Sequence, residues 1–401
     1  MTGDLVAELQ RRGVTDVDDS VLARALYSSD ASLYRVVPQV VARPRDADEL
    51  LAVLDASRAL GVPLTMRGAG TSIAGNAVGP GIVVDTVRHL DRLLSLDPEA
   101  RTAVVQPGVV HAVLQREAVV HGLRFGPDPS THTRCTIGGM IGNNACGSRA
   151  LGYGRTVDNV AGMRVAFGTG EVARLGGSST TEGEAATALG ALTDDHLAHV
   201  RTSFGRFSRQ VSGYSFEHLL PENGRRADRF MVGSEGTLAI VLEATVELVP
   251  DDPGRQLVVL GYPSMAEAAD AVPAVLSVGG AGLVACEGLD SRIVDLVRAR
   301  GSAVPDLPRG QGWLFVEVAG GQGPDVLTGL VEGAAALDHR LVSDVGEAAA
   351  LWRIREDGAG IAARSLDTPA YSGWEDAAVP PDQLGAWLRE FDDLLGEHGL
   401  D

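Results

Sequence analysis

Residues 66–85, MRGAGTSIAGNAVGPGIVVD, form a glycine-rich turn segment that runs directly into an apolar strand. Such a segment either binds a phosphate through its backbone or only turns the chain. A Rossmann turn places G-x-G-x-x-G between a strand and a helix. Here Ile73 stands at the position of the third glycine, and the strand GIVVD follows. The segment therefore predicts a β–loop–β unit, which argues against a Rossmann turn and favours backbone N–H groups wrapped around an anion.

The basic residues narrow the choice of phosphate-binding chemistry. The chain of 401 residues contains no lysine, so all of its basic side chains other than histidine are arginines. A P-loop NTPase and a PLP enzyme both need a lysine, so both are excluded in their usual forms. With 53 acidic against 34 basic residues, the net charge is −19. That charge repels nucleic acid and anionic membranes, so neither is an expected partner.

Cysteine usage and the N-terminus bear on cofactors and location. The cysteines are Cys135, Cys146 and Cys286, which are too few for an iron–sulfur cluster and have no zinc-site spacing. A sparse, odd number fits a reducing compartment. The first residues, MTGDLVAELQRRG, lack the apolar core of a signal peptide, and no run of about 18 apolar residues is present. We expect a cytoplasmic protein, with a peripheral position at the inner membrane face as the alternative.

Hydrophobic periodicity divides the chain into an N-terminal helical part, a middle part, and a C-terminal part that begins after residues 251–254. Residues 1–35 predict short helices, and residues 36–66 predict strand, helix and strand, with the helix starting near Asp46 and ending at Gly61. Residues 158–175 predict a β-hairpin that turns at residues 168–170. After residues 251–254 (DDPG), strands alternate with helices, which indicates a small α/β layer with an open sheet.

Three further turn-rich segments accompany the first one: residues 125–159, 212–224 (SGYSFEHLLPENG) and 232–238 (VGSEGTL). The second of the four contains TIGGMIGNNACG. Its glycines allow a flat group to lie against the backbone, and its two asparagines can hydrogen-bond the edge of an imide-like ring. A planar group together with a pyrophosphate is a dinucleotide cofactor. Each segment alone is a weak signal, because single glycine-rich loops are more often structural.

Taken in order, the segments RGAGTS, PDPST, TIGGMIGNNACGSRALGYG and VGSEGTLAIVLEATVELVP resemble the FAD-linked oxidases of the vanillyl-alcohol oxidase and p-cresol methylhydroxylase superfamily. Within it, the chain is most similar to the D-2-hydroxyacid dehydrogenase branch and to the FAD module of its long fused FAD and iron–sulfur oxidoreductases. The resemblance spans roughly residues 20–400. It implies an α+β chain with a two-lobed FAD-binding fold of the p-cresol methylhydroxylase type, followed by a partial ferredoxin-like α/β cap domain.

The resemblance also implies domain bounds and a cofactor site. We expect an N-terminal helical segment at 1–35, an FAD-binding domain at 36–250 with lobes at about 36–93 and 94–250, and an incomplete substrate domain at 251–401. The first loop would wrap the FAD pyrophosphate with Arg67, Gly68, Ala69, Gly70, Thr71 and Ser72. The flavin would be lined by Pro129, Ser130, Thr136, Gly138, Gly139, Asn144, Ala145 and Gly147. The adenine side would be closed by Glu235, Gly236 and Ile240.

The same resemblance addresses how FAD and substrate are held. Covalently flavinylated relatives often carry a histidine where this chain has Thr71, so non-covalent FAD is expected; Cys146 is interpreted as a small packed residue rather than a thioether site. The segment LWRIRED resembles the family's Trp-x-x-Arg, which makes Arg355 the candidate clamp for the substrate carboxylate. The alternative for Arg355 is a surface salt bridge with Glu356 or Asp357.

Two departures from the family pattern concern catalysis. Trp374 stands about where simpler D-2-hydroxyglutarate enzymes have a lysine, so substrate preference does not carry over directly. The family's later Gly-His-x-Gly-Asp-Gly segment is not found, and His398 does not take its place. No metal site is therefore predicted, and the catalytic base is not assigned. The other histidines, such as His111, His121 and His132, lack metal-ligand spacing and are expected on helix surfaces or in loops.

The resulting hypothesis is an FAD-dependent dehydrogenase or oxidase. It would transfer a hydride from a D-2-hydroxyacid, of the D-lactate, glycolate or D-2-hydroxyglutarate class, to flavin N5. Reduced FAD would pass electrons to an external acceptor or redox partner. Two alternatives stay open: a catalytically incomplete FAD-binding fragment or subunit, and an NADPH-dependent flavin reductase of the same fold. The oligomeric state is not predicted.

Overall fold

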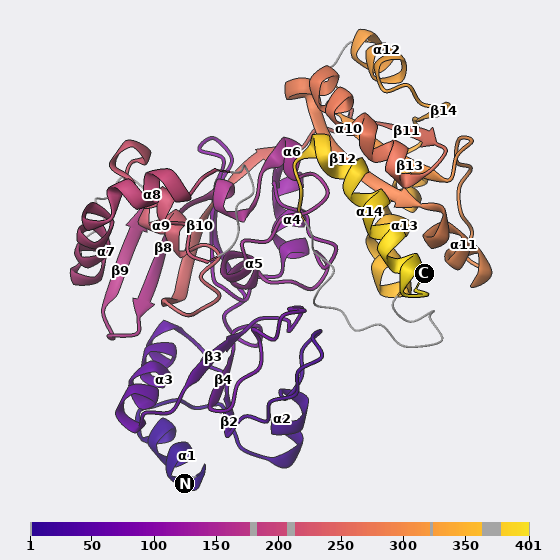
Figure 1. The fold of residues 1–401 in the computed structure, drawn as a ribbon. Helices are drawn as coiled ribbons and strands as arrows, with labels where there is room; N and C mark the ends of the chain where they lie inside the picture. The colour runs from indigo at the N-terminus through magenta and orange to yellow at the C-terminus, as the bar shows by residue number, and fades with distance from the viewer. Residues whose placement is uncertain (1, 177–182, 207–212, 321–323, 363–377, 401) are drawn as a thin grey trace. The chain divides into compact units, whose positions relative to one another are not determined.

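The computed structural model describes residues 2–176, 183–206, 213–320, 324–362 and 378–400 (Figure 1). The chain forms two compact units. Unit 1 consists of Met1–Gly147 and Gly154–Asp251, and unit 2 consists of Ser148–Tyr153 and Asp252–Asp401. A stretch of six residues between the two parts of unit 1 therefore belongs to unit 2.

A small, mainly parallel sheet organises the first lobe of unit 1, which ends before residue 93. Its strands, in spatial order, are β1 (Val17–Asp18), β2 (Val40–Ala42), β4 (Ile82–Asp85) and β3 (Leu64–Arg67). Both β2 and β3 run parallel to β4, and β1 is antiparallel to β2. The helices of this lobe are α1 (Thr2–Arg11), α2 (Val21–Leu26) and α3 (Ala47–Leu60). The apolar faces of α1 and α3 pack with the sheet into one core.

Local sequence signals set the ends of α3. The Asp46 carboxylate accepts a hydrogen bond from the Glu49 backbone N–H at 2.9 Å, which satisfies one donor of the first turn. Gly61 ends the helix with φ of 62°, a left-handed conformation that costs glycine little. The predicted start and end of this helix are both confirmed.

The glycine-rich segment connects β3 to β4 without a helix between them. β3 ends at Arg67, whose register partner in β4 is Asp85, and the two strands are parallel. The loop over residues 68–81 therefore leaves the carboxyl end of a parallel sheet, where open α/β sheets bind their ligands. The predicted β–loop–β arrangement is confirmed.

The second lobe of unit 1 is built on a larger antiparallel sheet. Its strands run in the order β5 (Leu93–Asp97), β6 (Thr102–Val105), β10 (Ala239–Pro250), β8 (Val160–Phe167) and β9 (Val172–Gly176), and β7 (Leu123–Phe125) pairs with the end of β10. The helices are α4 (His111–Val119), α5 (Ile137–Asn143), α7 (Glu184–Asp195), α8 (Leu197–Ser203) and α9 (Ala227–Met231). β8 and β9 form the predicted hairpin.

Strand β10 contributes to both hydrophobic cores of unit 1. Ile240 and Leu242 pack with the core of the first lobe, whereas Ala244, Val246 and Leu248 pack with the core of the second lobe. Side chains two apart in a strand share a face, so an uninterrupted strand would not divide them in this way. The register of β10 against β8 shifts between Val241 and Glu243, and this irregularity turns the even-numbered side chains to the other face.

Unit 2 contains a four-stranded antiparallel sheet. Its order is β12 (Leu283–Asp290), β13 (Gly312–Val318), β11 (Gln256–Tyr262) and β14 (Asp338–Val342). The helices are α6 (Ala150–Tyr153), α10 (Met265–Gly279), α11 (Ser291–Ala299), α12 (Pro324–Gly333), α13 (Val345–Ala362) and α14 (Leu384–Glu397). With α11 inserted after β12, the order of strands and helices is that of a ferredoxin-like split βαβ domain.

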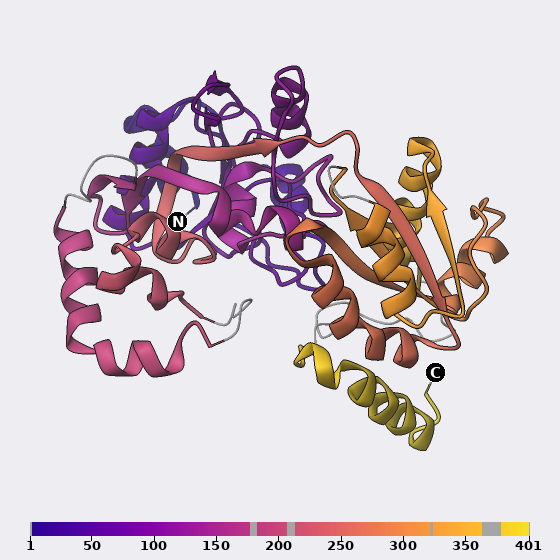
Figure 2. The same ribbon diagram turned by 90° about the horizontal axis from the view of Figure 1, so that it is seen from above.

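Helices cover both faces of this sheet. Helices α11 and α13 contribute to the core on one face, and α10 and α12 contribute to the core on the other. Helix α14 lies against α10, where Arg389 bonds the Asp270 carboxylate with two nitrogens (Figure 2). The sheet is thus buried on both sides, which explains the almost unbroken burial of β11 and β13.

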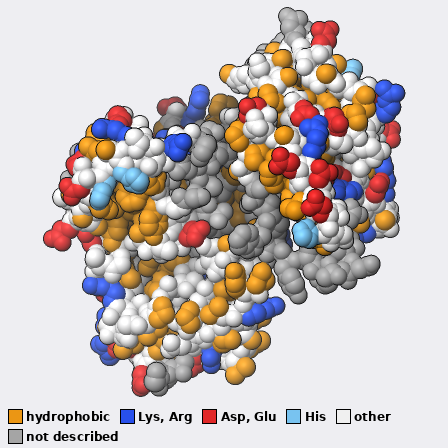
Figure 3. Space-filling view, in the orientation of Figure 1, with side chains coloured by type: hydrophobic (Ala, Val, Ile, Leu, Met, Phe, Trp, Pro, Cys, Tyr) orange, Lys and Arg blue, Asp and Glu red, His pale blue; other side chains and the backbone are white. Residues whose placement is uncertain are grey.

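Exposed apolar side chains gather on helix α2. Val21, Leu22 and Leu26 are 83%, 69% and 63% exposed, and Figure 3 shows hydrophobic side chains over this part of unit 1. Burial therefore contributes little to α2, which depends on the cap that Ser20 provides to the Ala23 N–H. Among the described residues, no helix has the length and apolar composition to cross a membrane.

Candidate functional site

Backbone donors line the first loop. Within the described part of the chain, the N–H groups of Gly68, Ala69, Gly70, Thr71 and Ser72 have no hydrogen-bond acceptor. Ala69 is exposed and the other four residues are half-buried. Because half-buried backbone N–H groups are normally paired, this run is a place where an anion can bind. Gly70 has φ of 67°, which helps to turn successive N–H groups toward one side.

Two side chains of the loop brace it from within. Arg67 donates from Nη1 to the carbonyl of Ala77 at 2.9 Å, which ties the start of the loop to its far end. A Cβ on Gly70 would lie 2.5 Å from Arg67 Nη2, so the guanidinium packs closely under the turn. The Ser72 hydroxyl donates to Asn76 Oδ1 at 2.7 Å and accepts from the Asn76 N–H at 3.3 Å. These contacts hold the loop's shape.

The first and second turn segments meet directly. A Cβ on Gly68 would overlap the Oγ1 of Thr136, so only glycine allows this approach. Thr136 is buried and caps α5 by accepting from the Gly139 N–H at 3.1 Å. Gly138 lies against Pro107, whose carbonyl accepts the Gly138 N–H at 2.8 Å. The glycines expected to receive the flavin thus also allow close contacts within the protein.

The end of the second segment folds back on its neighbours. Asn144 adopts φ of 51° at the end of α5, and its Oδ1 accepts from the Val157 N–H at 3.1 Å. The Ala145 carbonyl accepts from Thr156 N at 3.0 Å and Thr156 Oγ1 at 2.6 Å. The side-chain oxygen of Asn144, Oδ1, is therefore engaged within the fold. Among the described residues, the side-chain NH₂ of Asn144 is the group left to donate to the edge of a ring.

The PDPST segment lies beside this turn. A Cβ on Gly147 would overlap the carbonyl of Asp128, which precedes Pro129. The Pro129 carbonyl accepts the His132 N–H at 2.8 Å, so the segment forms a tight turn with Ser130 at its exposed tip.

The fourth and third segments complete the cluster. The Glu235 N–H donates to the carbonyl of Gly142 at 2.9 Å, and Glu235 has φ of 55°. Tyr214 in the third segment and Thr237 in the fourth share a hydrogen bond at 2.8 Å between their hydroxyls. All four turn segments therefore converge within unit 1, although they span residues 66 to 238.

Gly236 and Ile240 occupy different environments. Gly236 is exposed, has φ of 74°, and would place a Cβ in open space. Ile240 is 5% exposed and packs in the core of the first lobe. Glu235 and Gly236 are thus the accessible part of the predicted adenine side, and Ile240 supports it from below the surface.

His111, expected on a helix surface or in a loop, is instead buried. Its Nε2 lies 2.8 Å from the Pro127 carbonyl and donates to it, which fixes the proton on Nε2. Burial lowers the pKa of His111 to about 4. Its Nδ1 is buried without a hydrogen-bond partner among the described residues. The first residue of PDPST is thus held through its carbonyl by a neutral histidine, which the sequence pattern did not reveal.

In unit 2, Arg355 lies on α13 and donates from Nη2 to Glu287 Oε2 on β12 at 2.6 Å. The Arg355 side chain is 38% exposed, so it is accessible from solvent. The alternative partners, the side chains of Glu356 and Asp357, lie outside the described side chains, and Trp374 lies outside the described residues. Glu287 was not expected from the sequence as a partner of Arg355, because the two are far apart along the chain.

A second ion-pair group lies on the same face of the sheet. The buried Glu317 on β13 accepts from Arg149 Nε at 2.5 Å and from Arg149 Nη2 at 3.3 Å. Arg255 Nε lies 3.3 Å from Oε1 of this carboxylate, the oxygen that also accepts from Arg149 Nη2. The Arg149 guanidinium also lies 5.3 Å from the ring centroid of Trp352, one helical turn before Arg355. Arg149, within the second turn segment, thus supports the helix that carries Arg355.

No group of three or more metal-ligating side chains occurs among the described residues. Over the described ranges, unit 1 has a loop of unpaired backbone N–H groups beside converging turns, and unit 2 has accessible and buried arginines.

Comparisons with known proteins match two separate parts of the chain, one mainly in unit 1 and one in unit 2. Residues 38–176 match the family model described as FAD binding domain, and residues 252–401 match that of FAD linked oxidases, C-terminal domain. A D-2-hydroxyglutarate dehydrogenase of Pantoea ananatis is 29% identical over 98% of this chain and 42% of its own length. The glycolate oxidase subunit GlcD of Bacillus subtilis is 32% identical over 69% of this chain and 51% of its own length. The chain thus spans about half the length, or less, of these relatives.

A solved structure supports the fold. An alkyldihydroxyacetonephosphate synthase aligns with a TM-score of 0.62 and 17% identity, covering 90% of this chain and 64% of its own. The predicted α+β fold, with a two-lobed cofactor unit and a ferredoxin-like second domain, is confirmed.

Proposed function

Because this chain carries the FAD binding domain and the C-terminal domain of the FAD-linked oxidases, we propose that it oxidises a D-2-hydroxyacid and passes the electrons to an external acceptor. FAD is its cofactor, which the segments at residues 67–72, 129–147 and 235–240 would hold, and it would supply the acceptor for the hydride of the substrate α-carbon. The substrate class is that of D-2-hydroxyglutarate, glycolate and D-lactate. The names of the relatives in Pantoea ananatis and Bacillus subtilis support it.

The run of backbone N–H donors at residues 68–72 is the observation that carries the cofactor assignment. A pyrophosphate brings oxygens that accept these hydrogen bonds, and no lysine is needed for it. The residues that would hold FAD are those expected from the sequence, and they lie on the converging segments. A flavin over the second segment would meet Gly139, Asn144 and Ala145, with Glu235 and Gly236 toward the adenine.

We propose that FAD is bound without a covalent link. Thr71 has no nucleophilic ring nitrogen, and the half-buried Cys146 is the other candidate attachment point. Precipitating the protein with acid tests this. Yellow colour in the supernatant supports non-covalent binding, and yellow colour in the pellet contradicts it.

The substrate carboxylate would bind Arg355. The guanidinium contacts Glu287 through a single nitrogen, Nη2. An arginine fork offers further N–H donors, so Glu287 can fix its position while the remaining donors face a substrate carboxylate. A base must also take the proton of the substrate hydroxyl. We assign no residue of this chain to that role.

A second candidate function follows from how little of its relatives' length this chain spans. The chain spans 42% of the Pantoea ananatis relative, so an FAD-binding subunit or fragment that needs further chain for turnover is the alternative. We place either form in the cytoplasm, in line with the few cysteines and the acidic composition.

An anaerobic titration of the yellow holoprotein separates these functions. D-2-hydroxyglutarate, D-lactate or glycolate should bleach the flavin absorbance of a competent dehydrogenase. Failure of all three would overturn the dehydrogenase proposal and favour the fragment. Bleaching by NADPH alone would indicate a flavin reductase, and a protein that never binds FAD would contradict every form of the proposal.

A further inference from the structure

The segment Tyr27–Tyr34, which we call the N-terminal strap, lies against the glycine-rich loop. The Ala31 N–H donates to the Gly70 carbonyl at 3.0 Å. Asp30 Oδ2 accepts from the Ala77 N–H at 3.3 Å. A Cβ on Gly75 would lie 2.7 Å from the Tyr34 ring. The strap therefore contacts the beginning, middle and end of the loop.

Tyr27 connects the strap to Arg67. The Arg67 guanidinium lies 5.2 Å from the centroid of the Tyr27 ring, within the range of a cation–π contact. Arg67 is the residue that spans the loop to the Ala77 carbonyl. The ring of Tyr27 therefore stabilises the guanidinium in the position from which it braces the loop.

The position of Tyr27 is itself fixed from two directions. Its hydroxyl donates to the Asp85 carboxylate, which also accepts from the Val87 N–H at 2.7 Å. The Arg43 guanidinium lies 5.5 Å from the same ring centroid. Burial and this hydrogen bond raise the pKa of the Tyr27 phenol, so it stays a donor at neutral pH.

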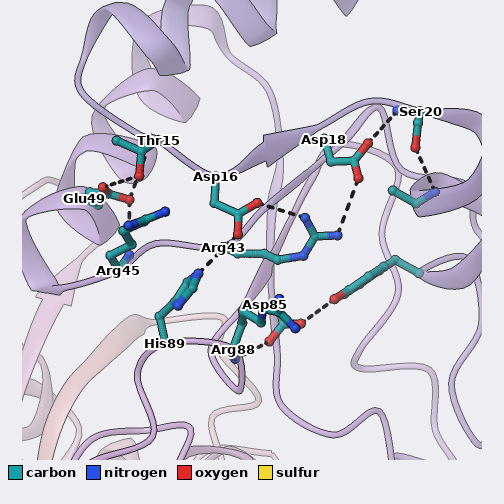
Figure 4. A network of polar contacts seen from close by, with 12 residues as sticks. Thr15, Asp16, Asp18, Ser20, Arg43, Arg45, Glu49, Asp85, Arg88 and His89 are labelled. Carbon is teal, nitrogen blue, oxygen red and sulfur yellow. Dashed lines mark hydrogen bonds and ion pairs between the residues drawn. The ribbon is translucent and has the colours of Figure 1, made fainter.

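Arg43 in turn is held by two carboxylates. Its Nη1 lies 3.0 Å from Asp16 Oδ1, and its Nη2 lies 3.7 Å from Asp18 Oδ2. His89 Nε2 lies 3.2 Å from the other oxygen of Asp16. Figure 4 shows this network, with Arg43 between the two aspartates and Asp85 nearby. Tyr27, Arg43 and Asp16 each have a partner in this network. The Tyr27 ring that contacts Arg67 is therefore held in place by the protein alone, without a ligand.

We propose that Tyr27 is a positioning residue of the FAD site, acting through Arg67. It holds the guanidinium across the loop, and this keeps the N–H groups of residues 68–72 turned toward the pyrophosphate. Arg67 then serves as a brace of the loop. The inference rests on the assignment of FAD to this loop, and it brings the strap into the cofactor site. A loop that is ordered in advance loses less conformational entropy when the ligand binds.

Cofactor affinity of the apoprotein tests this proposal. Titration of FAD, followed by quenching of its fluorescence, gives Kd without any need for turnover. Tyr27→Leu removes the π face and the hydroxyl but keeps an apolar side chain, and it should raise Kd about tenfold. Tyr27→Phe keeps the ring and should stay within about threefold of the parent. Equal Kd values for Tyr27→Leu and the parent would overturn the proposal.

A double-mutant cycle distinguishes action through Arg67 from general loosening of the lobe. If Tyr27 acts through Arg67, the variant carrying both Tyr27→Leu and Arg67→Gln should bind FAD about as tightly as Arg67→Gln alone. Additive losses would contradict it. Arg58→Gln, an exposed arginine on α3, is the matched control and should leave Kd unchanged.

The melting temperature of each apoprotein completes the design. Tyr27→Leu and Tyr27→Phe should melt within a few degrees of each other while their Kd values differ. A Kd difference that only follows a large drop in melting temperature would identify Tyr27 as a residue of fold stability and overturn its positioning role. If no variant binds FAD and the parent does not either, the cofactor assignment itself fails, which is a distinct outcome.

Discussion

Gly68 and Thr136 lie so close together that a Cβ on the glycine would overlap the threonine Oγ1. Gly68 opens the glycine-rich loop, and Thr136 caps helix α5 of the second turn segment. The contact sets how closely two segments that are distant along the chain approach each other.

Gly68→Ala should therefore abolish or strongly weaken FAD binding. The added methyl group must displace either the loop or the Thr136 cap, and both form part of the site. The FAD Kd should rise by at least about tenfold, measured by fluorescence quenching. Gly168→Ala is the control, because a Cβ at this exposed hairpin turn meets nothing within 4 Å. Similar Kd values for the two variants would contradict the close contact.

Arg355→Gln should raise KM for the hydroxyacid far more than it lowers kcat. Loss of a charge-assisted hydrogen bond to a carboxylate corresponds to about 30-fold in kcat/KM. Arg355→Lys should recover only part of this, because an ammonium group lacks the fork. Steady-state kinetics of the reconstituted holoprotein provides the measurement. Arg353→Gln, an exposed neighbour on the same helix, is the control and should behave like the parent.

Removing the carboxylate of Glu317 should destabilise unit 2. Glu317→Leu leaves Arg149 and Arg255 without the carboxylate that they share, and breaking such a buried group costs about 3 kcal/mol. The midpoint of urea denaturation should fall accordingly. Glu222→Gln breaks an exposed pair with Arg201 and should hardly change it. Equal effects of the two substitutions would show that burial does not control the energy of these pairs.

Stability should fall as the pH drops below about 6.5. Burial lowers the pKa of His111 to about 4, and the pKa of His218 is lowered to about 4 by burial and nearby arginines. An unfolded histidine has a pKa near 6.5, so between these values the unfolded chain binds more protons than the folded one. Each such group reduces stability by at most about 1.4 kcal/mol per pH unit in that window.

His111→Gln tests this pH dependence. The variant should lose less stability than the parent between pH 6.5 and 4, although its stability at pH 7.5 is lower, because glutamine packs differently. Melting temperatures across that range provide the comparison. His121→Gln, at an exposed position, should keep the slope of the parent. Parallel curves for the parent and His111→Gln would show that His111 does not stay neutral in the fold.

Local signals in the sequence were sufficient for part of this structure. Asp46 and Gly61 bound α3 because capping depends only on neighbouring residues. The β–loop–β unit followed from the apolar strand after the last glycine of the loop. The order of the motifs in the first, second and fourth turn segments indicated a dinucleotide site through family resemblance, and the structure brings those segments together.

Other features depend on contacts that a single sequence does not encode locally. The shift in β10 between Val241 and Glu243 sends Ile240 into a different core from Ala244, although both fit one alternating pattern. The pairing of Arg355 with Glu287 joins residues on different elements. His111 was expected on a helix surface or in a loop, but it is buried at the start of α4.

The hexapeptide Ser148–Tyr153 has a consequence for protein engineering. It is encoded between two parts of the cofactor unit, yet Gly152 packs on Val284 and Arg149 bonds to Glu317, both in unit 2. A chimera that replaces only residues after 251 would therefore join a foreign sheet to a native hexapeptide. To exchange unit 2 of this chain, a designer would have to transplant two separate stretches of gene, with the shorter one inside the sequence that encodes unit 1.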